Sequence, residues 1–297
     1  MTSSSHHTPL SGMILVVLAF GLLAGLDSMS KYMTAFLPVI AIVLWRYVTG
    51  TLFALVFGYA KRRAALWRTA HPWLQLLRGL LMTVSTLFVV LALRRLPLVT
   101  TSAILFSAPL WVAALSHLLL GEKVGPARWA AVVAGFLGVL IVLRPGTPDF
   151  QPAMLFALAA ALSFALYQLL TRRVGGHDDA VSSLFLSSAG AALLSLPLAA
   201  FIPVWPQENW QWWPLIAMGA LGTLAHLLLI EAYRRADAAQ LAPFIYTQIV
   251  WMIVIGWLVF GDVPDVMTLS GAALVIAAGV FIAARERARQ RRAAAGR

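Results

Sequence analysis

The sequence predicts an all-α membrane protein in which ten transmembrane helices form two five-helix inverted repeats. Composition, the lengths of the apolar runs and a repeated motif carry this prediction. Of the 297 residues, 61% are hydrophobic and only 11% are charged, whereas a soluble globular chain is about 45–50% apolar and about 25% charged. A bilayer core ~30 Å thick needs roughly 20 apolar residues per helix. Ten such helices leave only short loops, so a large domain outside the membrane is excluded.

Ten apolar runs separated by polar breaks define the expected helices. The clearest breaks are Lys61–Arg63, Arg144–Gly146 and Gly175–Asp179, which consist of charged residues or contain the Gly and Pro residues that favour turns. The expected spans lie near residues 13–32, 38–60, 73–93, 98–120, 127–143, 152–171, 180–202, 213–233, 240–260 and 266–284. The segment from Arg285 to Arg297 follows them as a basic, polar tail.

The distribution of Lys and Arg over the loops predicts that both termini are cytoplasmic. In that orientation ten Lys and Arg residues near the loops and six arginines of the tail lie inside, against four outside. This bias satisfies the positive-inside rule. The expected outer loop 203–214 contains four tryptophans and neither Lys nor Arg, which suits an aromatic belt at the outer interface. We therefore expect a multi-pass protein of a bacterial inner membrane, in contact with the lipid bilayer.

Composition and missing motifs exclude several kinds of chemistry. The chain has no cysteine, which excludes disulfides, thiolate catalysis and cysteine metal sites. It contains no metal-ligand motif and no phosphate-binding glycine loop, so we expect no metal, no cofactor and no direct use of ATP. The net charge of +11 lies in short loops and the tail, and we expect no nucleic-acid partner. The expected partner is a small-molecule substrate; the oligomeric state is left open, with a monomer as the working expectation.

A repeated motif divides the chain into two halves. Ala92-Leu93-Arg94-Arg95 recurs as Ala232-Tyr233-Arg234-Arg235, and we call the spacing between these two copies the repeat offset. The same offset relates further pairs: Trp111 and Trp251, Leu118 and Leu258, Gly121 and Gly261, and Glu122 and Asp262. Five helices are an odd number, so the second copy must enter the membrane from the opposite side, as an inverted repeat. We expect a first repeat at residues 1–147 and a second at residues 148–297, the latter including the basic cytoplasmic tail.

The residues around this motif resemble a known transporter family. Residues 92–146, ALRRLPLVTTSAILFSAPLWVAALSHLLLGEKVGPARWAAVVAGFLGVLIVLRPG, resemble the repeat of the drug/metabolite transporter superfamily, the EamA-type permeases. Residues 232–262, AYRRADAAQLAPFIYTQIVWMIVIGWLVFGD, resemble its second repeat, and Asp27–Lys31 and Trp45-Arg46 also look like that family. The resemblance implies ten helices, both termini inside, a central substrate cavity and export of metabolites. Among relatives, the bacterial amino-acid exporters, including the aromatic amino-acid type, look most similar.

An inverted repeat supplies two related gates around one midplane site, so we predict a transporter and not an enzyme. The predicted function is export of amino acids or similar small metabolites by alternating access. The first alternative is export or import of another metabolite: a nucleotide-like compound, a vitamin or a drug. A channel would need a pore-lining ring, and an intramembrane enzyme would need clustered catalytic acids or histidines. The sequence offers neither, and no catalytic residue is predicted.

Ionisable residues within spans are costly to bury and are therefore candidates for function. They are Asp27 and Lys31 in the first span, Arg46 in the second and Arg78 in the third. One interpretation is a buried charge network of Asp27, Lys31 and Arg46, in which Asp27 neutralises an arginine and ties the first helices together. The other is that one arginine, Arg78, remains to bind a substrate carboxylate, because the guanidinium fork matches carboxylate geometry.

A second set of candidates combines aromatic rings with hydrogen-bonding groups, as small-molecule pockets do. They are Ser107, Trp111, Tyr167, Tyr246, Gln248 and Trp251. Lipid-facing helices have little use for Gln or hydroxyl groups, so we expect these side chains to face the interior and bind substrate. The alternative is that they pack helices together. His226 lies mid-span and is either satisfied by a neighbour or titrates in a proton-coupled cycle, whereas His117 is expected to reach the interface.

Other unusual residues have a structural interpretation. Gly21 and Gly25 are spaced for close helix approach. Glu122 and Asp262 end their helices beside glycines, although a helix C-terminus disfavours acids. We expect both acids to accept partners from loops.

Overall fold

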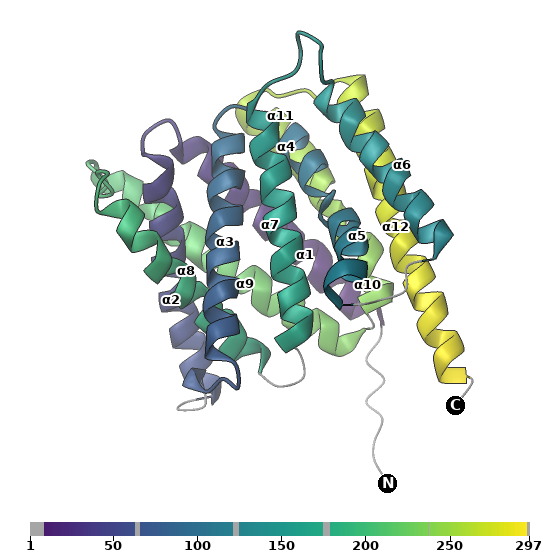
Figure 1. The fold of residues 1–297 in the computed structure, drawn as a ribbon. Helices are drawn as coiled ribbons and strands as arrows, with labels where there is room; N and C mark the ends of the chain where they lie inside the picture. Colours follow the sequence, from purple (N-terminus) through teal and green to yellow (C-terminus); the bar gives the residue numbers. More distant parts are fainter. Residues whose placement is uncertain (1–8, 63–65, 121–124, 175–178, 237, 296–297) are drawn as a thin grey trace.

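The computed structural model describes residues 9–62, 66–120, 125–174, 179–236 and 238–295 (Figure 1). Its helices are α1 (Pro9–Met33), α2 (Val39–Arg62), α3 (Pro72–Leu93), α4 (Leu98–Leu105), α5 (Ala108–Leu120), α6 (Pro126–Leu143), α7 (Ala153–Val174), α8 (Ala180–Ala199), the 3₁₀ turn η2 (Asn209–Gln211), α9 (Trp212–Arg235), α10 (Ala238–Ile245), α11 (Thr247–Phe260) and α12 (Val266–Ala295). Within these residues, ten segments are long and apolar enough to cross a membrane. The predicted ten spans are therefore confirmed, and two of them, α4–α5 and α10–α11, are each built from two helices.

Local sequence explains where several helices begin and end. Pro72 and Pro126 occupy the first turns of α3 and α6, where a missing N–H costs nothing. The Asp179 side chain accepts hydrogen bonds from the backbone N–H groups of Val181 and Ser182 and so caps α8. Gly261 ends α11 with φ of 67°, a left-handed conformation that glycine adopts without penalty.

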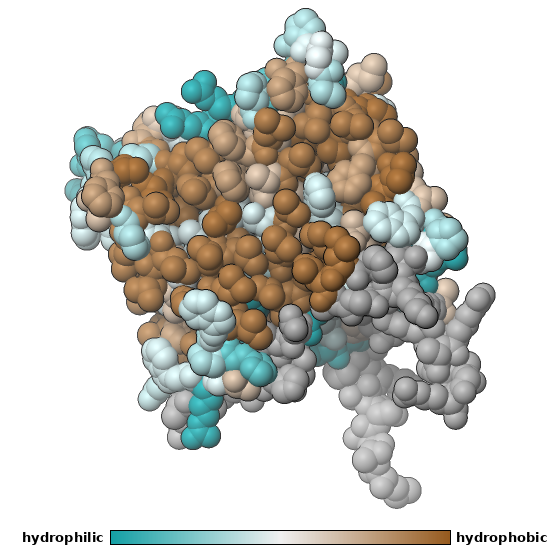
Figure 2. All heavy atoms as spheres, viewed as in Figure 1, coloured by the Kyte–Doolittle hydropathy of each residue, from teal (hydrophilic) through white to brown (hydrophobic). Residues whose placement is uncertain are grey.

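The bundle has two opposite ends and an apolar flank. Figure 1 shows α1 beginning and α12 ending at the lower side, which we call the terminal face. The loops after α1, α3, α6, α8 and α11 lie at the opposite end, which we call the far face. Figure 2 shows a broad hydrophobic surface between more hydrophilic ends. Exposed apolar side chains such as Val56, Leu118 and Leu258 suit contact with lipid tails.

Packing between the two halves obeys the repeat. In the repeat, α1 corresponds to α7 and α3 corresponds to α9. The contact of α1 with α9 therefore corresponds to the contact of α7 with α3, and both contacts are extensive. The α2–α8 and α6–α12 contacts map onto themselves. This is the symmetry that an inverted repeat with a two-fold axis in the membrane plane requires, and it confirms the predicted architecture. The boundary between residues 147 and 148 stays a prediction.

The same symmetry relates two places where a helix of one repeat packs closely against a helix of the other at glycine residues, which we call the glycine crossings. Gly79 of α3 lies against Gly190 and Ala191 of α8, where an added Cβ would be 3.0 Å from backbone atoms. Gly219 of α9 lies against Gly50 of α2, where an added Cβ would be 2.5 Å from the Gly50 backbone nitrogen. The repeat offset separates Gly79 from Gly219, and it also separates Gly50 from Gly190. Helices in membranes pack closely at such small residues, and each crossing here joins one repeat to the other.

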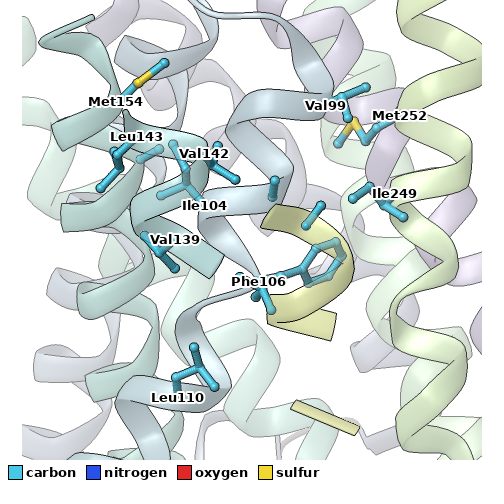
Figure 3. Close-up of a cluster of buried hydrophobic side chains, with 14 of the residues drawn as sticks. Val99, Ile104, Phe106, Leu110, Val139, Val142, Leu143, Met154, Ile249 and Met252 are labelled. Atoms are coloured by element: carbon cyan, nitrogen blue, oxygen red, sulfur yellow. The ribbon is translucent and has the colours of Figure 1, made fainter. Parts of the chain in front are cut away.

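Both two-helix spans are interrupted at equivalent positions. Phe106 and Ser107 separate α4 from α5, and Tyr246, the counterpart of Phe106 at the repeat offset, separates α10 from α11. Their ring centroids are 5.1 Å apart, so the two interruptions meet inside the bundle. Figure 3 shows Phe106 at its interruption, with Leu110 below it and Ile249 and Met252 on α11 nearby. The expected span 98–120 is present, but it is built from two helices: Pro109 lacks an N–H, and in a continuous helix its ring would clash with the carbonyl four residues earlier.

Candidate functional site

A cluster of three polar side chains, the Asp27 cluster, joins the two repeats inside the bundle. Arg46 Nη1 of α2 lies 3.5 Å from Asp27 Oδ1 of α1. Gln248 Nε2 of α11 lies 3.5 Å from the other carboxylate oxygen of Asp27. The side chains of Asp27 and Arg46 are only 13% and 17% exposed, so their charges are largely withdrawn from solvent. The predicted pairing of Asp27 with an arginine is present, and Gln248 extends it to the second repeat.

A second group, the Arg78 cluster, lies between α3, α7 and α8. Arg78 is 3% exposed and donates to Gln75 Oε1 at 2.5 Å, to Thr171 Oγ1 at 3.1 Å and to the Tyr167 hydroxyl at 3.1 Å. Its guanidinium also lies 5.0 Å from the centroid of the Tyr167 ring, within cation–π range. Ser187 of α8 donates to the same Gln75 oxygen at 3.3 Å. The acceptors that hold this buried cation are all neutral.

The two clusters occupy related places in the repeats. Asp27 and Tyr167 are counterparts at the repeat offset. Asp27 lies in the half of α1 nearer the far face, and Tyr167 lies in the half of α7 nearer the terminal face. The two clusters therefore lie in opposite halves of the bundle.

Lys31 and Arg78 do not join the Asp27 cluster. Lys31 Nζ donates to the Leu96 carbonyl at 2.6 Å and lies 3.6 Å from Asp262 Oδ2. It also lies 5.2 Å from the centroid of the Phe260 ring. One turn beyond Asp27, its side chain reaches the far-face ends of α3 and α11 instead. The expected network of Asp27, Lys31 and Arg46 is therefore limited, in the described residues, to the pair of Asp27 and Arg46.

The far-face loop between α11 and α12 binds two basic residues of the first repeat. Asp262 pairs with Lys31, and Asp265 pairs with Arg144, which also lies 3.0 Å from Asp149. Partial burial alone would raise the pKa of Asp265, but hydrogen bonds from Thr268 and the charge of Arg144 outweigh it and lower that pKa. The expectation that Asp262 accepts a partner from a loop is therefore wrong: its partner, Lys31, lies in the last turn of α1. Glu122, its counterpart, lies outside the described residues.

The His226 side chain forms a hydrogen bond within its own helix, α9. Its Nδ1 lies 2.7 Å from the Gly222 carbonyl, and because a carbonyl only accepts, Nδ1 carries the hydrogen. The side chain of His117 lies outside the described set. Among the residues that the structure does describe, no group of three His, Asp or Glu side chains could hold a metal ion.

Trp111 and Trp251 pack between helices. The Trp251 ring lies over Gly21 of α1, where an added Cβ would be 3.1 Å from the ring. Trp251 is 37% exposed, on the face of α11 that also carries the exposed Val254 and Leu258. Trp111 lies edge-on to Phe136 of α6, with ring centroids 4.7 Å apart. These placements favour the packing alternative for both tryptophans.

Ser107 and Tyr246 lie at the interrupted spans. Ser107 is fully buried, and within the described part of the chain its hydroxyl has no hydrogen-bond partner. The Tyr246 ring packs on Phe106, and its hydroxyl lies directly against Gly279 of α12. Interrupted helices are where transporters of this general design place their binding sites. Ser107 and Tyr246 thus both lie at the interruptions of the two-helix spans, and their part in substrate binding stays a prediction.

Sequence reasoning missed three members of the Arg78 cluster. Gln75, Thr171 and Ser187 are neutral, and neutral polar residues in a span attract less attention than charges. Gln75 could have been found, because it precedes Arg78 by three residues and such residues share a helix face. Thr171 and Ser187 could not, because their contact depends on how α7 and α8 pack against α3.

Comparison with known proteins gives matches over nearly the whole chain. The family model described as the EamA-like transporter family matches residues 10–144 and again residues 151–284. The S-adenosylmethionine uptake transporter of Rickettsia felis is 30% identical over 256 residues, 86% of each chain. The riboflavin transporter of Vibrio cholerae is 31% identical over 297 residues, 97% of this chain and 98% of the relative.

A more distant relative and a solved structure extend the comparison. The pseudopaline exporter CntI of Pseudomonas aeruginosa is 27% identical over 274 residues, 92% of this chain and 95% of the relative. A crystal structure of a protein that is 21% identical superposes with a TM-score of 0.61, covering 95% of this chain and 97% of that one. At that identity the superposition supports the fold alone.

Proposed function

Because the chain belongs to the EamA-like transporter family and is a membrane transporter, we propose that it carries a small heterocyclic metabolite of the nucleoside or flavin type. The observation that carries the proposal is its similarity to an S-adenosylmethionine transporter and a riboflavin transporter, which extends through both repeats. Both compounds combine a flat nitrogen heterocycle with a polar chain. Their common chemistry calls for hydrogen-bonding side chains inside the bundle, and the Asp27 and Arg78 clusters provide them.

The similarity supports the alternative prediction better than amino-acid export. The relatives described above are named for S-adenosylmethionine, riboflavin and pseudopaline, and none of them is named as an amino-acid exporter. They are named as transporters and not as enzymes, which also weighs against an intramembrane enzyme. One is an uptake transporter and one is an exporter, so the relatives do not favour one direction.

The proposed binding region lies at the Asp27 cluster, beside the interruption of the second repeat, because Gln248 follows Tyr246 by two residues. Arg46 and Gln248 approach Asp27 from different repeats, so a relative movement of the repeats would change their contacts. We propose that the heterocycle edge replaces part of these contacts as the bundle opens from one face to the other. The interfaces between repeats rest on glycine crossings and ion pairs at helix ends, which can separate without unfolding a helix. Such a rearrangement around a fixed site is alternating access.

Transport by the purified full-length chain in liposomes tests the proposal. Labelled riboflavin and labelled S-adenosylmethionine are followed inward and outward, with and without a pH gradient. We expect saturable flux of at least one of them. A hydrogen bond to a charged group is worth about 1.5–3 kcal/mol, so Gln248→Leu should lower flux by roughly 10- to 100-fold.

The matched control is Gln151→Leu, the same substitution at an exposed residue that precedes α7. It should transport like the wild type. Absence of flux for both compounds would overturn the proposed substrate class. Equal flux in Gln248→Leu and Gln151→Leu would remove the Asp27 cluster from the binding region.

A further inference from the structure

Arg78 stands apart from the other charges that the structure places inside the spans. Arg46 has Asp27 at 3.5 Å and Lys31 has Asp262 at 3.6 Å. In the part of the chain that is described, no carboxylate oxygen lies within 4.0 Å of the Arg78 guanidinium. Arginine cannot lose its proton in a protein, so a full positive charge is buried at 3% exposure without a counter-charge beside it.

The neutral partners position this charge without neutralising it. Thr171 accepts from Nε, Gln75 accepts from Nη1 and the Tyr167 hydroxyl accepts from Nη2. A guanidinium has five N–H donors, so one N–H on each terminal nitrogen is left. An oxyanion that approaches the guanidinium end-on uses one N–H from each terminal nitrogen. The side chains around Arg78 therefore hold it in a fixed orientation and leave one donor on each terminal nitrogen for such an ion.

A purely structural role explains this arrangement poorly. Burying a charge in a membrane protein is expensive, and such residues are retained for function. Two of the three neutral contacts, those with Thr171 and Tyr167, join α3 to α7, and an uncharged side chain could make such contacts equally well. They also differ from the contacts of Arg46, whose charge is balanced inside the protein. What the Arg78 cluster lacks is a negative charge, and the transported compound can supply it.

We propose that Arg78 binds an oxyanion of the substrate, a carboxylate or a phosphate, in the half of the bundle nearer the terminal face. This rests on the proposed function and narrows it: the metabolite carries its heterocycle on the same molecule as an anionic group. Tyr167 stacks parallel to Phe164, with ring centroids 5.8 Å apart, and it contacts the guanidinium through both its ring and its hydroxyl. It is thus placed to orient Arg78 as the ion arrives.

Two matched pairs of probes test the proposal in the full-length protein in nanodiscs. S-adenosylmethionine is compared with its decarboxylated form, and riboflavin 5′-phosphate with riboflavin. Charge-assisted hydrogen bonds of this kind are worth about 10- to 100-fold in affinity. We expect the wild type to bind the anionic member of at least one pair at least ~10-fold more tightly. The pair that responds tells carboxylate from phosphate.

Substitution of Arg78 should remove that preference and nothing else. In Arg78→Gln the two members of the responding pair should bind about equally. The affinity for the member without the carboxylate or phosphate should be the same as in the wild type. Arg78→Lys keeps the charge but loses the fork, so it should keep part of the preference. Arg94→Gln, which changes an exposed arginine at the far-face end of α3, should keep all of it.

A second measurement does not depend on the substrate. Acetate or inorganic phosphate, exchanged for chloride at constant ionic strength, should raise the melting temperature of the wild type and leave that of Arg78→Gln unchanged. A preference that persists in Arg78→Gln, or a wild type that responds to neither anion nor to either pair, would overturn the anion site. If acetate or phosphate stabilises only the wild type while neither pair binds, the anion site stands and the proposed substrate class fails.

Discussion

Each glycine crossing has one glycine at which alanine should destabilise the protein, Gly219 or Gly79. At the opposite glycine of each crossing, alanine should leave the stability nearly unchanged. At Gly219 the added Cβ would lie 2.5 Å from the Gly50 nitrogen and 2.7 Å from the Thr49 carbonyl carbon, and closer still to the Thr49 hydroxyl. Backbone atoms cannot move aside cheaply, so α9 must separate from α2. Overpacking of this kind costs about 1–3 kcal/mol, occasionally more. At the equivalent Gly79 the nearest atoms are 3.0 Å away, so the cost should be smaller.

The opposite member of each crossing provides the matched control. An added Cβ at Gly50 would have its nearest neighbour at 3.9 Å, and at Gly190 at 3.7 Å, both ordinary contact distances. Alanine also favours a helix over glycine by about 0.5–1 kcal/mol. Gly50→Ala and Gly190→Ala should therefore be neutral or slightly stabilising, although they lie on the same crossings.

Thermal unfolding of the four detergent-solubilised variants, followed by tryptophan fluorescence, gives the comparison. One kcal/mol corresponds to roughly 2–4 °C for a chain somewhat shorter than this one. We expect the melting temperature of Gly219→Ala to fall by several degrees, that of Gly79→Ala to fall less, and the two controls to stay within about 2 °C of the wild type. If Gly219→Ala and Gly50→Ala melt together, the close approach of α2 and α9 is refuted, and with it the symmetry argument that uses it.

Three further predictions concern charges. Reporter fusions should place both termini in the cytoplasm and loop 203–214 outside, as the 16-to-4 distribution of Lys and Arg requires; a periplasmic C-terminus contradicts it. Asp27→Asn and Arg46→Gln should each lower the melting temperature because each leaves a buried partner alone, and the double variant should lose less than the sum; additivity would show that the pair is not coupled. Asp265→Asn keeps the cap of α12 but loses the pair with Arg144, so it should be less stable than the wild type by at most about 1 kcal/mol near neutral pH. The folded pKa of Asp265 is lowered, so this difference should be present above the ordinary aspartate pKa and vanish as pH falls through the lowered one; a difference that does not change with pH would refute the ion pair.

The spans and the repeat were predictable because each depends on a pattern along the chain. A run of about 20 apolar residues has few alternatives to a membrane helix, and the repeat offset is visible in Arg94-Arg95 and Arg234-Arg235. The interruption at Phe106 was also within reach, since Pro109 forbids a regular helix there. The position equivalent to Pro109 in the second repeat is Ile249, but Pro243 lies three residues before the interruption at Tyr246.

The candidate site was predictable only where a residue is rare in membranes. Asp27 and Arg46 were found because charges seldom occur within spans. The faces of Trp111 and Trp251 could not be predicted, because helices that are apolar all round give no periodic contrast between lipid and interior. The same limitation hid Thr171 of α7, which accepts from Arg78, and Ser187 of α8, which donates to Gln75.

The place that holds Asp27 in the first repeat holds Tyr167 in the second. A carboxylate in one half and a phenol in the other mean that the two halves of the pathway do not offer a solute the same environment. A passive carrier built this way should show different half-saturation concentrations from the two sides of the membrane. Equilibrium nevertheless fixes the ratio of maximal rate to half-saturation constant to be equal in both directions. The side that binds more tightly must therefore be the side from which net transport is slower at saturation.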